Sequence, residues 1–407
     1  MKYEKREIII VGVLVALAFI LRFNDIAEVK FFTGDEVGNV ATAYNFVERG
    51  DQSPDNWYHP PMKNFMLYPV LKMFGDNPYG WRIRNVVAGT LLVLVIYYMG
   101  EIFFKSRFTG GMAAILVLSD PLLIATSRTT TEEVPIVLVI ALATIAAQRF
   151  KETSCAGCCL VSGLLFGIAV ATKLYAVPVI LVVTAVISFS LARDKRWPDI
   201  VRLACTLSFL PLSIYILSYA PWFIRGYTFT EWLLMQRDML REVSALSLEN
   251  FISPVGPLVA GGPQFWFIKP ISMGFGSVTQ ETLQLRVLMN NLPVWLLISP
   301  SVVYLGIKSI RNRNFSMMLV PAIFLSIYGL SLGVNRPIML HSSIPILPFG
   351  FLAVGFATEQ IAGRWKHLVM VAALSCSLYL YPLAAGIQVP TWLYRPVLGY
   401  LTIVNIH

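Results

Sequence analysis

Charged residues are scarce in this sequence. Only 14% of its 407 residues are Asp, Glu, Lys or Arg, whereas soluble globular proteins carry about 25%. Apolar residues account for 56% of the chain, and its mean hydropathy is +0.66. This balance excludes an ordinary soluble domain and indicates a membrane protein. Because the bilayer core offers the backbone no water, apolar segments of about 20 residues are expected to cross it as helices.

The sequence also lacks the marks of separate domains. It contains no internal repeat, no low-complexity tract and no linker that would set a soluble domain apart. After the first apolar segment, residues 22–30 offer no small-residue cleavage site of the kind that ends a signal peptide. We therefore expect one integral-membrane domain over residues 1–407, with the N-terminal segment as its first membrane helix.

Eleven apolar segments are candidates for membrane helices. Several are short and contain Pro or Gly, so the count is uncertain by about one or two. The segments are 8–21, 85–104, 111–126, 134–147, 160–171, 174–191, 200–219, 292–307, 317–332, 342–356 and 367–383. They predict an all-α, multi-pass membrane protein. Within the third segment, Asp120-Pro121 marks a kink near the outer end of the helix.

Lysine and arginine are concentrated in alternate connections between these segments. If the N-terminus is cytoplasmic, every inner loop holds at least two cations, whereas the short outer connections hold one each, at Arg128, Lys173 and Arg336. Short cytoplasmic loops are rich in Lys and Arg, so this pattern supports an inside N-terminus and an outside C-terminus. The bias largely explains the net charge of +9, and no nucleic-acid partner is inferred from it.

The five cysteines do not predict a disulfide framework. Cys155, Cys158 and Cys159 fall in a predicted cytoplasmic loop, and Cys205 and Cys376 fall in predicted helices. Cys155 and Cys158 form a CxxC motif with no second pair of metal ligands nearby in the sequence. This isolation favours ordinary small residues at a helix start over a zinc or redox site.

Two stretches, 23–84 and 221–291, resist membrane insertion and are expected outside it. The first, a predicted catalytic loop, contains two segments with apolar residues at helical spacing, 37–47 and 62–74, which can lie at the interface as amphipathic helices. The second mixes tryptophans with arginines, a composition suited to contact with headgroups and anions. We expect the functional residues in these outer regions.

A series of short motifs follows the first membrane segment. They are Asp35-Glu36, HPPMK (59–63), Arg82 and Arg84, SRTTTEE (127–133), ATKLYA (171–176) and PWFIRGYTFTEWLLMQ (221–236). In this order they resemble the polyprenyl-phosphate-sugar-dependent glycosyltransferases of the GT-C class, and most closely the protein O-mannosyltransferase family. Compared with that family, Lys63 comes one position early, Glu133 replaces an Asp, and the histidines expected after Gln236 are missing.

The resemblance implies a GT-C fold and an inverting glycosyltransferase in the inner membrane, with its active site on the outer face. The enzyme would move a sugar, a mannose-like hexose being favoured, from a polyprenyl-phosphate donor to a hydroxyl group, with protein Ser or Thr as the favoured acceptor. A lipid or polysaccharide acceptor is one alternative, and a membrane transporter or flippase is another. Transfer of this kind needs a base for the acceptor hydroxyl and cations for the departing phosphate.

The same resemblance suggests roles for individual residues. Asp35 would be the base, with Glu36 and Glu133 as further catalytic acids. Arg84, Arg128 and Lys173 would bind the donor phosphate. Residues with a substrate-binding or structural role would be His59, Lys63, Arg82, Arg237, Arg336 and His341. No metal cofactor is implied, although two carboxylates from separate loops could instead hold a divalent cation.

Each of these roles has a simpler alternative. Acids in the first turn of a helix offset its dipole by about 0.3–1 kcal/mol, so Asp35, Glu36 and Glu133 could be capping residues. Single cations at helix ends commonly extend to lipid headgroups. We therefore expect at least one of the three predicted phosphate ligands to have only a structural role.

Overall fold

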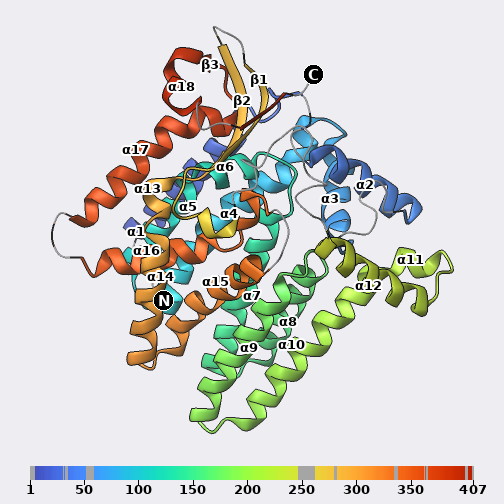
Figure 1. Cartoon of the computed structure of the whole chain (residues 1–407). Coiled ribbons are helices and arrows are strands. Elements are labelled where there is room, and N and C mark those ends of the chain that lie inside the picture. The colour runs from blue at the N-terminus through green and yellow to red at the C-terminus, as the bar shows by residue number, and fades with distance from the viewer. Residues whose placement is uncertain are drawn as a thin grey trace.

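A computed structural model gives the arrangement of the chain (Figure 1). It describes residues 5–30, 32, 35–51, 59–245, 262–278, 282–333, 338–361, 363, 365–398 and 402–405. The described residues are mostly helical, as the composition predicts. A small β-sheet is the main exception.

Every predicted membrane segment coincides with a helix or with two consecutive helices. In the first half of the chain these are α1 (Lys5–Phe23), α4 (Pro78–Phe104), α5 (Arg107–Ser119), α6 (Pro121–Ser127), α7 (Glu133–Thr153), α8 (Ala156–Val170), α9 (Ala176–Arg193) and α10 (Trp197–Ser218). In the second half they are α13 (Leu292–Trp295), α14 (Ile298–Arg311), α15 (Phe315–Gly333), α16 (Leu347–Glu359) and α17 (Trp365–Ala385).

Length and composition qualify seven of the described helices as membrane spans, or eight if α5 and α6 form one bent span. Helices α8 and α16 are apolar but shorter. Helix α1 is long enough but carries Lys5, Arg6, Glu7 and Arg22. The chain is thus a multi-pass membrane protein, while the total of eleven spans stays a prediction.

The kink predicted at Asp120-Pro121 is confirmed. Helices α5 and α6 meet there at 61°. Asp120 accepts the backbone N–H of Leu123 at 3.0 Å and so caps α6, while Pro121 occupies the first helical position, where no N–H is needed. The other carboxylate oxygen accepts the Trp295 indole N–H at 2.8 Å. The break therefore joins α6 to α13 and directs the chain after Ser127 toward the site described below.

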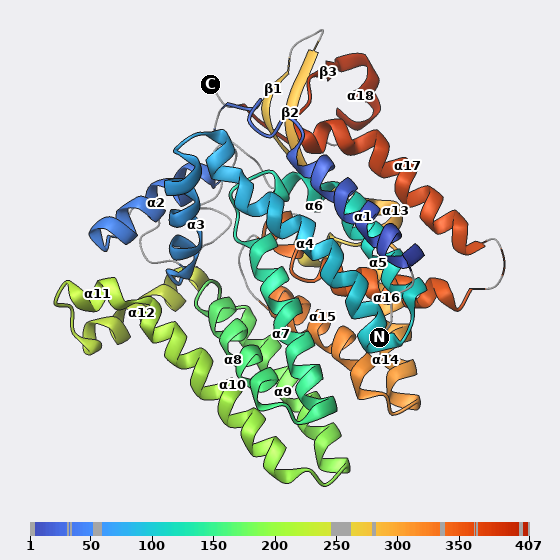
Figure 2. The same cartoon turned by 180° about the vertical axis from the view of Figure 1, so that it is seen from behind.

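Two helices form in the first predicted outer loop, as the amphipathic pattern indicates. They are α2 (Glu36–Arg49) and α3 (Met62–Phe74). Val40 and Ala43 of α2 pack against Leu67 and Leu71 of α3, beside Trp81 at the start of α4. Both views place this pair next to one end of α4 (Figures 1 and 2). The pair therefore positions the residues at the start of α2 against those at the start of α4.

The second predicted outer region contains helices and strands. Its described elements are α11 (Ala220–Ile224), α12 (Phe229–Ala245), the 3-10 turn η2 (Pro263–Phe265), β1 (Ser272–Val278) and β2 (Thr282–Met289). Near the C-terminus follow the 3-10 turn η3 (Leu340–Ser343), β3 (Val389–Pro390), α18 (Thr391–Leu398) and β4 (Thr402–Asn405). The strands form one sheet in the order β3-β2-β1-β4, in which only the β1–β4 pair is parallel.

The sheet lies against the C-terminal helices. Leu283, Leu285 and Val287 of β2 pack with Leu383 of α17 and Tyr394 of α18 in a small apolar cluster. A larger core runs through α4, α5, α7, α9, α15 and α16. Within it, 78% of the apolar stretch of α4 is buried, against 22% for α10. Helix α4 is therefore central, and most of α10 is left for lipid.

Candidate active site

Asp35 lies at the position that caps α2, but it does not act as a cap. Its backbone carbonyl accepts the N–H of Asn39 at 3.0 Å, while among the described residues its carboxylate accepts no hydrogen bond from the first turn. The residue is exposed. The capping explanation therefore does not account for this side chain, and its carboxylate is available to a ligand.

Four charged or titratable side chains surround Asp35 electrostatically, namely His341, Glu132, Glu133 and Lys173. Neighbouring protein atoms restrict the hydration of the carboxylate although its surface is exposed, and this crowding raises the pKa of Asp35 above its ordinary value. The two glutamates raise that pKa further, whereas His341 and Lys173 act to lower it. Asp35 is thus a carboxylate with increased basicity, and both acidic and basic side chains lie near it.

The centre of this group is a buried set of two acids and two cations. Lys173 forms a short ion pair with Glu133, and its ammonium lies 3.5 Å from Glu132. The Lys63 ammonium lies 3.9 Å from Glu132 on the other side. Glu132 and Glu133 are only 6% and 2% exposed, so their charges depend on these lysines for compensation.

The acids and lysines of this set shift each other's pKa values. Burial acts to raise the pKa of Glu132, but Lys63 and Lys173 outweigh it and hold that pKa at about 2. Burial likewise acts to lower the pKa of Lys173, and Glu133 and Glu132 together raise it above its ordinary value. At neutral pH Glu132 and Lys173 are therefore both charged.

The segment 128–132, between α6 and α7, is fixed to α2 and α3. The amide of Asn39 donates to the carbonyl of Thr130 at 2.7 Å and accepts the Lys63 ammonium at 3.1 Å. The backbone N–H of Thr130 donates to Glu36 at 3.0 Å. On the far side, the N–H of Met62 donates to the carbonyl of Ala171 at 3.0 Å. These bonds bring the motifs around Asp35, Lys63, Glu133 and Lys173 together.

Glu36, for which the sequence predicts a catalytic role, has the contacts of a structural residue. It is fully buried, and its two oxygens accept Arg82 Nε and Nη2 at 2.9 Å each. Arg82 also donates to the carbonyls of Ile26 and Val29, at 2.9 and 2.6 Å. The pair thus joins α2, α4 and the segment after α1, next to Asp35.

Three other predicted residues adjoin the acidic group. Arg84 donates to the carbonyl of Thr131 at 2.9 Å and has Glu132 and Glu133 as its charged neighbours. His341, in η3, lies 4.0 Å from Glu133. His59 is half-buried and acts to lower the pKa of Glu132. Side chains from α4, η3 and the segment before α3 therefore face the same acids.

Arg128 is not brought to this group. It is 1% exposed, and its Nη1 donates to the carbonyls of Leu21, Arg22 and Asn24 at 2.7 to 3.3 Å. Its Nη2 donates to the carbonyl of Ala385 at 3.1 Å. Its Nη1 thus caps the end of α1 and its Nη2 the end of α17, while its Nε makes no hydrogen bond to any described residue. These contacts favour a structural role for Arg128 over the predicted binding of phosphate.

Of the two remaining predicted residues, the structure describes only Arg237, which is not among the charged neighbours of the acids. Arg237 is an exposed residue of α12 paired with its neighbour Asp238 at 3.0 Å. Arg336 lies outside the described residues. The sequence reasoning assigned no role to Glu132 or to Tyr175. Tyr175 has Glu133 and Glu132 as its charged neighbours. The double acid at 132–133 and the tyrosine of the ATKLYA motif are the sequence signals for these two residues.

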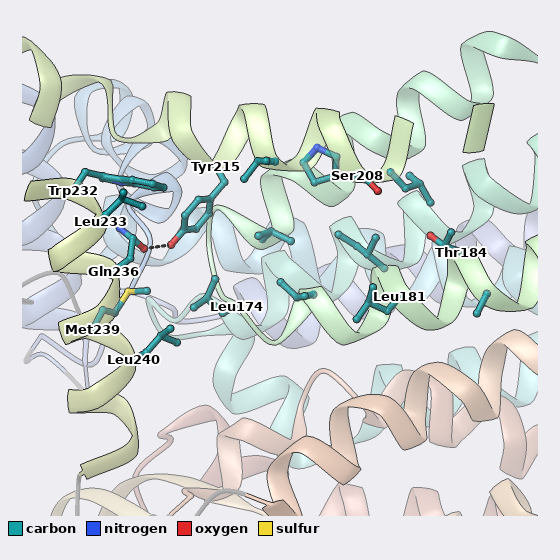
Figure 3. A pocket seen from close by; sticks show the side chains of 17 residues that line it. Leu174, Leu181, Thr184, Ser208, Tyr215, Trp232, Leu233, Gln236, Met239 and Leu240 are labelled. Atoms are coloured by element: carbon teal, nitrogen blue, oxygen red, sulfur yellow. Dashed lines mark hydrogen bonds between the residues drawn. The ribbon is translucent and has the colours of Figure 1, made fainter. Parts of the chain in front are cut away.

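An apolar groove begins beside Lys173. Its volume is about 680 Å³, and it runs between α9 and α10, with α12 across one end (Figure 3). Leu174, the next residue after Lys173, lines it, as do Leu181 of α9 and Trp232 of α12. Where α12 meets α10, the Tyr215 hydroxyl donates to Gln236 at 2.5 Å. The charged group around Lys173 thus adjoins a long apolar groove.

The described residues of the site do not form a set of metal ligands. Within the described ranges, no three His, Cys, Asp or Glu side chains are grouped so that they could hold a metal ion. Glu132 and Glu133, the nearest approach to such a set, are instead compensated by Lys173 and Lys63. A cation at these acids would have to displace the lysines.

The chain is similar in sequence and in fold to known proteins. Residues 58–217 match the family of dolichyl-phosphate-mannose-protein mannosyltransferases. A polyprenol-phosphate-mannose–protein mannosyltransferase of Mycolicibacterium smegmatis is 27% identical over 201 residues, which are 40% of this chain and 39% of that protein. Among solved structures, the S. cerevisiae Pmt1-Pmt2 complex bound to its sugar donor gives a TM-score of 0.75 at 11% identity, covering 95% of this chain and 91% of that one. ArnT from Cupriavidus metallidurans, bound to undecaprenyl phosphate, gives 0.60 at 16% identity, covering 92% and 64%.

The chain has the fold of these solved structures. In sequence it resembles the protein mannosyltransferases. The match to the Mycolicibacterium relative covers only 39% of the length of that protein. The match to the family covers residues 58–217, which include Lys63, Glu133 and Lys173 but not Asp35 or His341.

Proposed function

We propose that this protein is a glycosyltransferase that moves a sugar from a polyprenyl-phosphate donor to a hydroxyl acceptor. The observation that carries the proposal is the junction at residues 173 and 174. Lys173 belongs to the charged group around Asp35, and Leu174 lines the apolar groove. A sugar phosphate carried on an isoprenoid tail combines the same two chemistries in one molecule.

The donor would lie across this junction. Its tail would fill the groove between α9 and α10, where burial stabilises each methylene group by about 0.8 kcal/mol. Its phosphate would meet Lys173 and Arg84, a point charge and a planar guanidinium that suit phosphate oxygens. Because Glu133 and Glu132 already compensate Lys173, an arriving phosphate would share that ammonium with them.

Transfer would be a direct displacement. Asp35 accepts the proton of the acceptor hydroxyl as that oxygen bonds to the anomeric carbon, and the bond from this carbon to the phosphate oxygen breaks. Polyprenyl phosphate leaves with the electron pair of the broken bond, and Lys173 and Arg84 stabilise its charge. With one carboxylate as base and no covalent intermediate, the configuration at the anomeric carbon inverts.

The names of the relatives support a more specific form of the reaction. The matching family and the Mycolicibacterium protein are named as protein mannosyltransferases that use mannose on a lipid phosphate. We therefore propose mannose, or a similar hexose, as the sugar and a protein Ser or Thr hydroxyl as the acceptor. The alternation of Lys and Arg between connections supports an active site on the outer face of the inner membrane.

A reconstituted assay with the full chain tests this function. The purified protein would be incubated in liposomes with labelled polyprenyl-phosphate sugars and with Ser- and Thr-containing peptides. We expect Asp35→Asn to lower turnover by at least about 100-fold, the low end of what a general base contributes, with donor binding retained. Asp25→Asn is the matched control, because Asp25 is exposed and bonded to Asn24; its turnover should equal that of the wild type.

Three results would overturn the assignment. Wild-type turnover in Asp35→Asn would reject the base. Transport of a labelled solute across the liposomes, without sugar transfer to any acceptor, would favour a transporter. Loss of activity on chelation, restored by a divalent cation, would show that a metal rather than the lysines balances Glu132 and Glu133.

A further inference from the structure

Two cysteines meet at the turn between α7 and α8. Cys155 caps α8, and its Sγ accepts the backbone N–H of Cys158 at 3.2 Å. In sequence the motif resembles ordinary small residues, but in the structure the sulfur of the first cysteine lies against the backbone of the second.

This pair differs from the other cysteines in its solvent exposure and in having a second cysteine nearby. Cys155 is exposed and Cys158 is half-buried, while the adjacent Cys159 is 1% exposed. Ala156 and Gly157, between the two thiols, are exposed and too small to cover them. Cysteines 205 and 376 lie on α10 and α17, each without a second cysteine at such spacing. Only the CxxC pair therefore combines exposure with a thiol neighbour.

The backbone before Cys155 is held in place from α10. Arg196 donates to the carbonyl of Lys151 and to the hydroxyl of Ser154, at 2.6 Å each. The Ser154 hydroxyl in turn donates to Asp199 at 2.7 Å. These bonds fix the turn, so the spacing of the two thiols is set by the fold and not by a freely moving loop.

The site also favours the reactive form of the first thiol. The Cys158 side chain and its backbone N–H lower the pKa of the Cys155 thiol. A thiolate at the start of a helix is further stabilised by the helix dipole. Side chains three positions apart on a first turn lie about 5–6 Å apart at Cβ, so a modest tightening of the turn reaches the about 3.5–4.5 Å of a disulfide.

We propose that Cys155 and Cys158 form a redox-active dithiol that exchanges with low-molecular-weight disulfides and closes to an intramolecular disulfide. This inference is independent of the sugar transfer proposed above. The 21 residues of α7 place the turn at the opposite end of the helix from Glu133, about 30 Å away.

The exchange takes two balanced steps with oxidised glutathione. The Cys155 thiolate attacks one sulfur of glutathione disulfide, forming a mixed disulfide and releasing one glutathione thiolate. Cys158 then loses its proton and attacks the Cys155 sulfur, which expels the second glutathione. In total, two protein thiols are oxidised to one disulfide, and one glutathione disulfide is reduced to two glutathione molecules that carry the two protons.

Oxidation of the intact purified protein tests the proposal. The wild type would be incubated with oxidised glutathione, quenched with acid, alkylated and analysed by intact mass and by peptide mapping. We expect the loss of two alkylatable thiols, a disulfide joining Cys155 to Cys158, and no bound glutathione. A variant with Cys205→Ser, the matched control for another exposed thiol, should behave in the same way.

The single variants separate the two steps. Cys158→Ser should stop at the mixed disulfide and keep one glutathione on Cys155, whereas Cys155→Ser should form no disulfide. If the wild type also keeps a glutathione adduct, or retains both thiols at glutathione ratios that oxidise a control CxxC peptide, the proposal is wrong. Activity need not be measured, so failure of this test leaves the proposed glycosyltransferase untouched.

Discussion

Asp35 and Glu36 are neighbours in the sequence, and their carboxylates meet opposite conditions. Asp35 is exposed and leaves the first turn of α2 uncapped, while Glu36 is fully buried against Arg82 and Thr130. The resemblance to the family singles out both acids, but only the three-dimensional contacts separate a candidate base from a structural ion pair. Two adjacent residues point to different sides of a helix start, and no local pattern states which side will be covered.

Replacement of Glu36 should therefore lower the free energy of unfolding. In Glu36→Gln the amide oxygen can still accept from Arg82 Nε and from the Thr130 N–H, but the amide NH2 group then faces Arg82 Nη2, a second donor. The guanidinium of Arg82 also loses its counter-charge. Breaking a buried ion pair in this way costs about 3–5 kcal/mol. Thermal unfolding in detergent would measure this loss. Asp35→Asn, at the exposed neighbour, should stay within about 0.5 kcal/mol of the wild type; equal stability of the two variants would contradict the structural assignment of Glu36.

The pH dependence of transfer reports on the charges around Asp35. The base works only when ionised, and crowding together with Glu132 and Glu133 raises its pKa, so activity should be lost as the pH falls through that raised value. Glu132→Gln removes one negative charge and leaves Lys63 and Lys173 less compensated. Both changes favour ionised Asp35, so the acid limb of kcat/KM should move to lower pH.

Two further variants complete this measurement. His341→Gln removes a group that lowers the pKa of Asp35, so its acid limb should move to higher pH. Glu48→Gln changes an exposed acid paired with Lys72, at the far end of α2, and should leave the profile unchanged. An acid limb that stays fixed in both Glu132→Gln and His341→Gln would show that another group titrates.

Among the elements, hydrophobic patterning predicted the helices far better than the strands. All eleven apolar segments are helical, and α3 has the predicted bounds of 62–74. Strands β1 and β2 lie in the second predicted outer region, where the sequence predicted no strand. Half of their pairing depends on β3 and β4, which come more than 100 residues later, and a sheet joined by such distant strands leaves a weak local signal.

Helices α4 and α5 cross closely at two glycines. A Cβ at Gly100 would lie 2.2 Å from the Cα of Gly110, so the helices would have to separate. Overpacking of this kind costs about 1–3 kcal/mol, and Gly100→Ala should lower the unfolding temperature in detergent. Gly111→Ala is the control on the facing helix α5, next to Gly110, because no described atom comes within 4 Å of its added methyl group; this variant should gain about 0.5–1 kcal/mol.

At the scale of the whole molecule, the site is an assembly of segments that are distant in sequence. Asp35, Lys63, Glu132, Lys173 and His341 come from five separate parts of the chain. The order of motifs predicted most of these residues, but their pairing depends on how α2 and α3 rest against α4 and on the break before α6. A cation at a helix end also looks the same in sequence whether it binds phosphate or, as Arg128 does, caps another helix.

The apolar groove makes a prediction about donor length. Ala185 lines it on α9, about 14 Å along the helix from Ala176, which is farther than one isoprene unit reaches from a phosphate held at Lys173. Ala185→Trp would fill this part of the groove. Displacing two methylene groups of the tail costs about 1.6 kcal/mol, so KM for a long-chain donor should rise about tenfold while KM for a single-isoprene donor stays the same.

The test depends on comparing the KM values for the long-chain and the single-isoprene donor. Val201→Trp, on the exposed face of α10 and outside the groove, is the matched control and should change neither KM. If Ala185→Trp raises KM equally for both donors, the substitution has disturbed the phosphate end and the groove does not hold the tail. If neither KM changes, the tail lies elsewhere on the protein, because a tail held along α9 could not avoid an indole placed in its path.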